Sequence, residues 1–82
     1  MSRVVERRAL ESATRELVDE ILASSPVGVQ EAKQAIDRAL DVSLSEGIDL
    51  EDLAWRRAVA SEDRPEGIAA FGERRAPEWK GR

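Results

Sequence analysis

The sequence predicts an all-α fold of about four helices with no sheet. Apolar residues recur at spacings of three and four along most of the chain, which is typical of helices with one buried face. No segment alternates between apolar and polar residues in the way that a strand does. Ser, Asp, Pro and Gly residues stand where helices would begin and end. We expect one helical domain over residues 1–82, with helices at 6–23, 26–44, 50–60 and 64–75 and a tail at 76–82.

The first helix is predicted from its apolar and charged faces. The apolar face is formed by Leu10, Ala13, Leu17, Val18, Ile21 and Leu22. On the opposite face, Glu11 and Arg15 form an i,i+4 pair in the favourable order, which contributes about 0.2–0.5 kcal/mol. Val4 and Val5 precede this helix as a β-like stretch that is too short to form a sheet.

The second helix has a clear start signal. Ser25 is suited to the N-cap and Pro26 to the first turn. The apolar stripe that follows comprises Val29, Ala32, Ile36, Ala39, Leu40 and Ser43. Its small residues indicate close approach of a neighbouring element. Gly47 is expected to end the helix as a left-handed residue.

The third and fourth helices are placed by their caps. Asp49 is expected to cap the helix at 50–60, which carries Leu50 and Leu53 on its apolar side. Asp63 is expected to cap the fourth helix, with Pro65 in its first turn and Pro77 as its stop.

Composition excludes several functions. The 82 residues include no His and no Cys, so the commonest general base, metal ligands and thiol nucleophile are absent. No catalytic constellation and no metal site are predicted. The net charge of −4 argues against nucleic acid as a partner. No apolar run is long enough to span a membrane and no signal-peptide region is evident, so a cytoplasmic protein is expected.

A binding pattern involves Trp55, Phe71 and Arg74. Arg74 follows Phe71 by three residues, which would place both on one side of a helix. An aromatic ring beside a guanidinium suits a purine with attached phosphates. Residues 71–82 also hold four basic and two acidic side chains within an acidic protein. The alternative is that Trp55 and Phe71 are large residues of an aliphatic core, and sequence physics alone favours this alternative.

Three stretches of the chain resemble the crotonase (enoyl-CoA hydratase/isomerase) superfamily, in the family's order. The stretch SSPVGVQEAK at 24–33 is similar to the family's serine-proline and alanine-lysine helix start. The segment at 50–60 resembles the family's next helix. The ending SEDRPEGIAAFGERRAP at 61–77 is similar to the family's aspartate, glutamate-glycine, alanine-phenylalanine and basic series.

The resemblance implies that the chain is the C-terminal helical part of an enzyme whose N-terminal catalytic spiral domain is absent. That part covers coenzyme A (CoA) and assembles subunits, and alone it is expected to be inactive. Phe71 falls at an aromatic site near the CoA adenine, Arg74 at a basic phosphate site, and Trp55 at a further aromatic site. Arg74 stands where the family often has Lys, and Trp55 where it has Phe, which changes geometry and bulk.

The resemblance also implies the parent chemistry and partners. The parent enzyme would hydrate a 2-enoyl-CoA or carry out related CoA-thioester enolate chemistry, with no tightly bound cofactor. Expected partners are a second copy in a dimer or trimer, a crotonase spiral domain, and acyl-CoA bound weakly. Without its spiral domain the chain should expose apolar helix faces. The alternative function is a small helical protein-interaction module that does not bind CoA.

Overall fold

The computed structural model describes residues 3–82 and contains only helices and connecting segments. The α-helices are α1 (Leu10–Leu22), α2 (Pro26–Arg38), α3 (Leu44–Val59) and α4 (Asp63–Glu73). A short 3-10 helix, η1 (Arg7–Ala9), precedes α1. No strand occurs between residues 3 and 82, and Val4 and Val5 lie in irregular structure. The prediction of an all-α fold of about four helices is confirmed.

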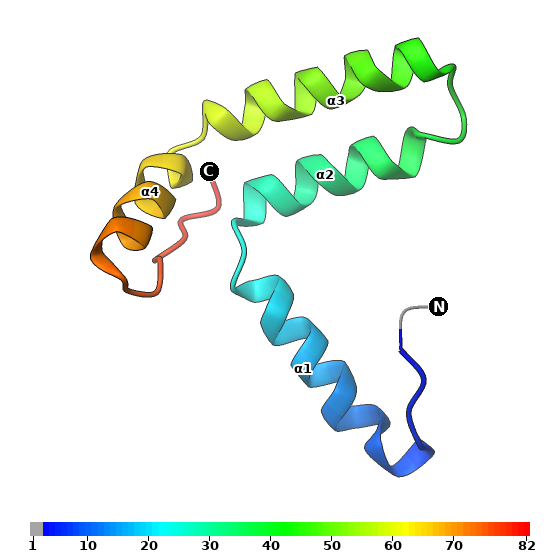
Figure 1. The fold of residues 1–82 in the computed structure, drawn as a ribbon, viewed down its shortest axis with the longest axis vertical. Coiled ribbons are helices and arrows are strands. Elements are labelled where there is room, and N and C mark those ends of the chain that lie inside the picture. Colours follow the sequence, from blue (N-terminus) through cyan, green and yellow to red (C-terminus); the bar gives the residue numbers. More distant parts are fainter. Residues whose placement is uncertain (1–2) are drawn as a thin grey trace.

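The helices form an open, flat arrangement. α2 and α3 run antiparallel as a hairpin (Figure 1). α1 extends away from the start of α2, and α4 follows the C-terminal end of α3, opposite the hairpin loop. The chain measures 43 × 38 × 17 Å, and its radius of gyration is 15.8 Å. A compact domain of this length would have a radius of about 12 Å. The helices therefore do not enclose a common centre.

The start of α2 follows the predicted chemistry. The Ser25 hydroxyl oxygen accepts a hydrogen bond from the backbone N–H of Gly28 at 3.3 Å, and Pro26 occupies the first position of the helix. The prediction of Ser25 as the N-cap is confirmed. This cap satisfies one of the N–H groups that the first turn leaves without a helical partner.

The predicted boundary between the second and third helices is wrong. α2 ends at Arg38, and α3 begins at Leu44 rather than at residue 50. The Ser43 hydroxyl oxygen accepts a hydrogen bond from the backbone N–H of Glu46 at 3.2 Å. Ser43 and Glu46 have the spacing of a capping box, which starts the helix earlier. Gly47 and Asp49 consequently lie inside α3, and neither ends nor caps a helix.

Both ends of α4 also differ from prediction. The N-cap position is occupied by Glu62, without a side-chain cap bond, and Asp63 is the first helical residue. The helix ends at Glu73, and Arg74 has a left-handed backbone with φ 55°. The N–H of Arg75 donates to the carbonyl oxygen of Ala70 at 3.0 Å. This is a Schellman ending in which arginine takes the position usually held by glycine.

The first predicted helix is shorter than its predicted span of 6–23. Residues 7–9 form η1, and the α-helix itself runs from Leu10 to Leu22. Beyond Ala23 the chain turns into the Ser25 cap of the next helix.

The described chain has almost no core. Ala70, at 2% exposed, is its fully buried apolar residue, and Asp63, at 1%, is its fully buried charged residue. The accessible surface is 7082 Å², whereas a compact monomer of this mass would expose about 4,900 Å². Ile36 and Leu40, from the predicted stripe of α2, are 71% and 98% exposed. The expected exposure of apolar helix faces is confirmed.

Among residues 3–82, no helix combines the length and apolar character needed to cross a bilayer.

Candidate functional site

Trp55 lies beside a shallow hollow at the junction of α3 and α4. The hollow has a volume of about 300 Å³, and its lining includes Trp55, Val59, Ile68 and Trp79. The Trp55 side chain is 64% exposed. It therefore presents its indole to solvent at the edge of a mostly apolar surface.

Phe71 is the most exposed aromatic residue, at 89%. It lies near the end of α4, where the following turn leaves the helix. The interpretation of Trp55 and Phe71 as core residues is therefore wrong within the described chain. Both are available for contact with another molecule.

Arg74 does not extend the helix that carries Phe71. Because α4 ends at Glu73 and Arg74 has a left-handed backbone, the predicted i,i+3 relation to Phe71 does not hold. Within residues 3–82 the guanidinium of Arg74 makes no ion pair or hydrogen bond. Neither Phe71 nor Arg74 lines the hollow beside Trp55. The structure leaves all three residues exposed but does not gather them into one pocket.

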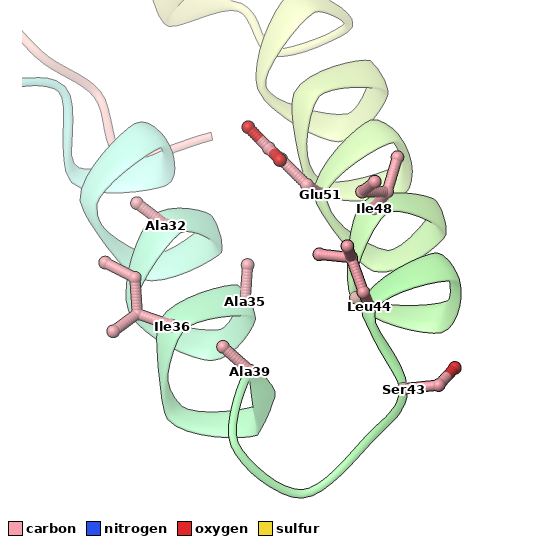
Figure 2. Close-up of a pocket in the computed structure, with 9 residues that line it drawn as sticks. Ala32, Ala35, Ile36, Ala39, Ser43, Leu44, Ile48 and Glu51 are labelled. Carbon is pink, nitrogen blue, oxygen red and sulfur yellow. The ribbon is translucent and has the colours of Figure 1, made fainter.

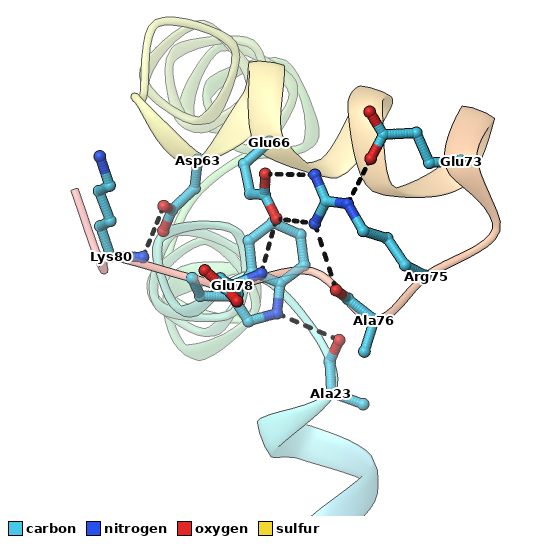
Figure 3. A network of polar contacts seen from close by, with 9 residues as sticks. Ala23, Asp63, Glu66, Glu73, Arg75, Ala76, Glu78 and Lys80 are labelled. Atoms are coloured by element: carbon cyan, nitrogen blue, oxygen red, sulfur yellow. Dashed lines mark hydrogen bonds and ion pairs between the residues drawn. The ribbon is translucent and has the colours of Figure 1, made fainter.

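The most constrained polar group is the carboxylate of Asp63. Its two oxygens accept hydrogen bonds from the backbone N–H groups of Lys80 and Gly81, each at 2.7 Å. Figure 3 shows the bond from Lys80. The backbone N–H of Asp63 donates in turn to the carbonyl oxygen of Arg82 at 3.1 Å. This explains why Asp63 does not cap α4: both carboxylate oxygens are directed at the chain end.

Glu66, one turn further along α4, holds the same segment. Its carboxylate forms a two-point ion pair with Arg75, at 2.7 and 3.0 Å, and accepts the N–H of Glu78 at 2.7 Å. The hydrogen bonds from Arg75, and then from the Glu78 amide, lower the pKa of Glu66 to about 2. Bonds to Glu66 and then to Glu73 raise the pKa of Arg75. Glu66 is therefore charged throughout the physiological range.

Trp79 connects the chain end to a second helix. Its indole Nε1–H donates to the carbonyl oxygen of Ala23, just beyond α1, at 3.2 Å. Its ring lies 3.1 Å from the place where a side chain on Gly67 would begin. A side chain at position 67 would be in tight contact with the ring, which would have to shift by a few tenths of an ångström.

Sequence reasoning did not identify Asp63, Glu66 and Trp79 as a group. The available signal was the acidic start of the fourth helix and the basic composition of residues 74–82. That charge division is compatible with a site for an external anion or with a solvated helix end. In the structure, several of these charges and backbone N–H groups satisfy each other.

A larger hollow of about 450 Å³ lies between α2 and α3 near their connecting loop. Figure 2 shows alanines and Ile36 on the α2 side and Leu44, Ile48 and Glu51 from α3 on the other. Glu51 is the only charged residue lining it. The lining of this hollow is therefore suited to contact with apolar groups. Over residues 3–82, no three potential metal-binding side chains of the His, Cys, Asp and Glu types come together.

Comparisons with known proteins agree on one family. The model of the Enoyl-CoA hydratase/isomerase family matches residues 1–82. The chain is 42% identical over 81 residues to (E)-benzylidenesuccinyl-CoA hydratase of Thauera aromatica, covering 99% of this chain and 32% of that protein. It is 39% identical over 66 residues to mitochondrial enoyl-CoA hydratase domain-containing protein 2 of Mus musculus, covering 80% and 22% respectively.

A solved structure matches in three dimensions as well. The crystal structure of enoyl-CoA hydratase from Bacillus anthracis superposes with a TM-score of 0.91 at 35% identity, over 96% of this chain and 31% of that one. The chain thus spans a third or less of the length of these relatives. Since the family model and the relatives agree over nearly all of its residues, the chain belongs to the enoyl-CoA hydratase/isomerase family.

Proposed function

We propose that this chain is the C-terminal part of an enoyl-CoA hydratase/isomerase family protein, where it covers CoA and assembles subunits. The observation that carries this proposal is the exposure of Trp55 and Phe71 in a chain with almost no core. Large aromatic side chains at 64% and 89% exposure contribute little to folding here. Such residues are typical of binding surfaces.

Each of the three proposed CoA residues has a chemical role. The ring of Phe71 would stack against the adenine, and the guanidinium of Arg74 would form paired hydrogen bonds with the phosphates. Trp55 would line the same ligand from α3. Because the three residues do not share a pocket in the isolated chain, we expect its affinity for CoA to be weak.

The proposed parent reaction is hydration of a 2-enoyl-CoA or a related step through a CoA-thioester enolate. An oxyanion hole of a spiral domain would stabilise that enolate, and catalytic carboxylates of the same domain would act as acid and base. We propose that the 82-residue chain alone does not perform this reaction, since we assign it no acid or base. A cytoplasmic location and a role in fatty acid metabolism belong to the same proposal.

Titration with CoA, followed by NMR, tests the binding proposal. We expect saturable shifts at the Trp55 indole, the Phe71 ring and the Arg74 side chain, with a Kd of about 1 mM or weaker. The Phe71→Ala variant should lose the shifts, whereas Arg15→Ala on α1 should retain them. Absence of shifts in the parent chain, with mass that increases with concentration in sedimentation, would instead support the interaction module without CoA binding.

Activity is tested directly with crotonyl-CoA. We expect no turnover by the purified chain above a matched blank. Turnover that disappears on removal of the chain would contradict the assignment of catalysis to a spiral domain.

Exposed apolar faces also support the proposed assembly role. The hollow between α2 and α3 and the exposed face of α1 offer surfaces for a second copy in a dimer or trimer, or for a crotonase spiral domain. Isolated chains with such surfaces tend to associate.

A further inference from the structure

The position of α4 has no explanation in helix packing. α2 and α3 pack along each other, but α4 makes no comparable contact with any α-helix among the described residues. Its one fully buried apolar side chain is Ala70, which removes little apolar surface from water. A helix held this weakly by side-chain packing needs another restraint.

The chain end supplies contacts to the first half of α4, from Asp63 to Gly67. Lys80 and Gly81 bind the first residue of α4, Asp63, and Glu78 binds Glu66 one turn later. Arg75, which follows the end of the helix, also forms an ion pair with Glu66. Extended backbone thus lies along the helix, anchored by carboxylates (Figure 3).

The same segment also reaches α1. Trp79 lies against Gly67 on α4 and donates its indole N–H to the Ala23 carbonyl oxygen beyond α1. Ala23 and Trp79 are 56 residues apart in sequence. The segment therefore bridges two helices that do not pack on each other.

We propose that residues 77–82 are a strap that sets the position of α4 relative to the junction of α1 and α2. Asp63 is its main anchor, because the residue is 1% exposed and its carboxylate accepts hydrogen bonds from two backbone N–H groups of the strap. Trp79 is the bridge to α1. Insofar as Phe71 binds CoA, which rests on the proposed function, the strap also positions that ring.

Distance measurement between spin labels tests the strap. The chain contains no cysteine, so Gln30→Cys on α2 and Gly72→Cys on α4 provide two unique labelling sites. A side chain at position 72 meets no neighbouring atom. Labelled chain diluted with excess unlabelled chain reports distances within one molecule. We expect a narrow distance distribution in the otherwise unchanged chain.

Two changes should release α4. Asp63→Ala removes the anchor, and a chain that ends at Ala76 removes the strap, so both should broaden the distribution. Asp49→Ala, which removes an exposed carboxylate from α3, should leave it narrow. Circular dichroism must show that the helices persist in each variant. A distribution that stays narrow without the strap, or that is already broad with it, would overturn the proposal.

A milder variant separates the bridge from the anchor. Trp79→Phe keeps an aromatic ring but loses the donor to Ala23, so we expect partial broadening. An unchanged distribution in Trp79→Phe would remove the bridge from the proposal. All of these measurements are made without CoA, so failure of CoA binding would leave their outcome untouched.

Discussion

At the residue scale, backbone geometry at single positions determines where the helices begin and end. Ser43 begins α3 by accepting the N–H of Glu46, and Arg74 ends α4 in a left-handed conformation. Both positions differ from the sequence-based boundaries, and each allows a direct test with a matched control.

Arg74→Gly should stabilise the end of α4. A non-glycine residue in the left-handed region is strained by contact between its Cβ and the backbone, so glycine should gain about 1 kcal/mol. Arg15→Gly, at a helical position in α1, should instead cost about 1 kcal/mol. Unfolding followed by circular dichroism compares the two. Equal loss of stability in both variants would contradict the role of the backbone at Arg74.

Ser43→Ala should destabilise α3 by about 1 kcal/mol, because the N–H of Glu46 loses its acceptor. Asp49→Ala should change stability by less than about 0.5 kcal/mol, since Asp49 lies within the helix. Chemical shifts of residues 44–49 report the helix start. Retention of a helical start at Leu44 in Ser43→Ala, with unchanged stability, would remove the cap from this account.

At the element scale, the strap depends on charge as well as on geometry. Glu66 binds Arg75 and the Glu78 amide, and Lys80 contributes a smaller attraction. The Glu66 carboxylate must be ionised to accept all of these hydrogen bonds. Acid should therefore weaken the strap only when the pH falls far enough to protonate Glu66.

The stabilisation that Glu66 provides should decrease as the pH falls. The pKa of Glu66 falls from 4.5 to about 2 on folding, so its stabilisation is complete above pH 4.5 and is lost as the pH falls toward about 2. NMR titration of the Glu78 amide should show this low midpoint. Glu66→Gln should abolish that transition, whereas Glu11→Gln on α1 should preserve it. A midpoint near 4.5 in the parent chain would show that the ion pair does not form in solution.

At the scale of the whole molecule, the apolar surface that the helices leave exposed should promote self-association. Ile36→Asp combined with Leu44→Asp introduces two charges at the α2–α3 hollow and should weaken self-association by at least tenfold, or about 1.4 kcal/mol. Gln30→Asp combined with Gln34→Asp adds the same charge to α2 alone and serves as the control. Sedimentation velocity over a range of concentrations measures both. Equal association in the two variants would place the contact elsewhere.

Local chemistry allowed much of the fold to be predicted from the sequence. The period of apolar residues gave the helical class, and the Ser25-Pro26 pair gave the start of α2. The ending at 61–77 pointed to the family to which the chain belongs. The loop at residues 39–43 was not predicted because the apolar pattern continues through it. In addition, Gly47, which lies inside α3, resembled a residue that ends a helix.

The sequence by itself thus determined the helical class, the family and the three residues proposed to bind CoA, because these depend on periodicity and on short motifs. Only the tertiary structure decided that Trp55 and Phe71 are exposed, and that Asp63, Glu66 and Trp79 hold the chain end against α4. The physical reason is that burial and hydrogen bonding between residues up to 56 positions apart depend on how the chain returns on itself. The spacing of residues along the sequence does not show which distant residues come into contact.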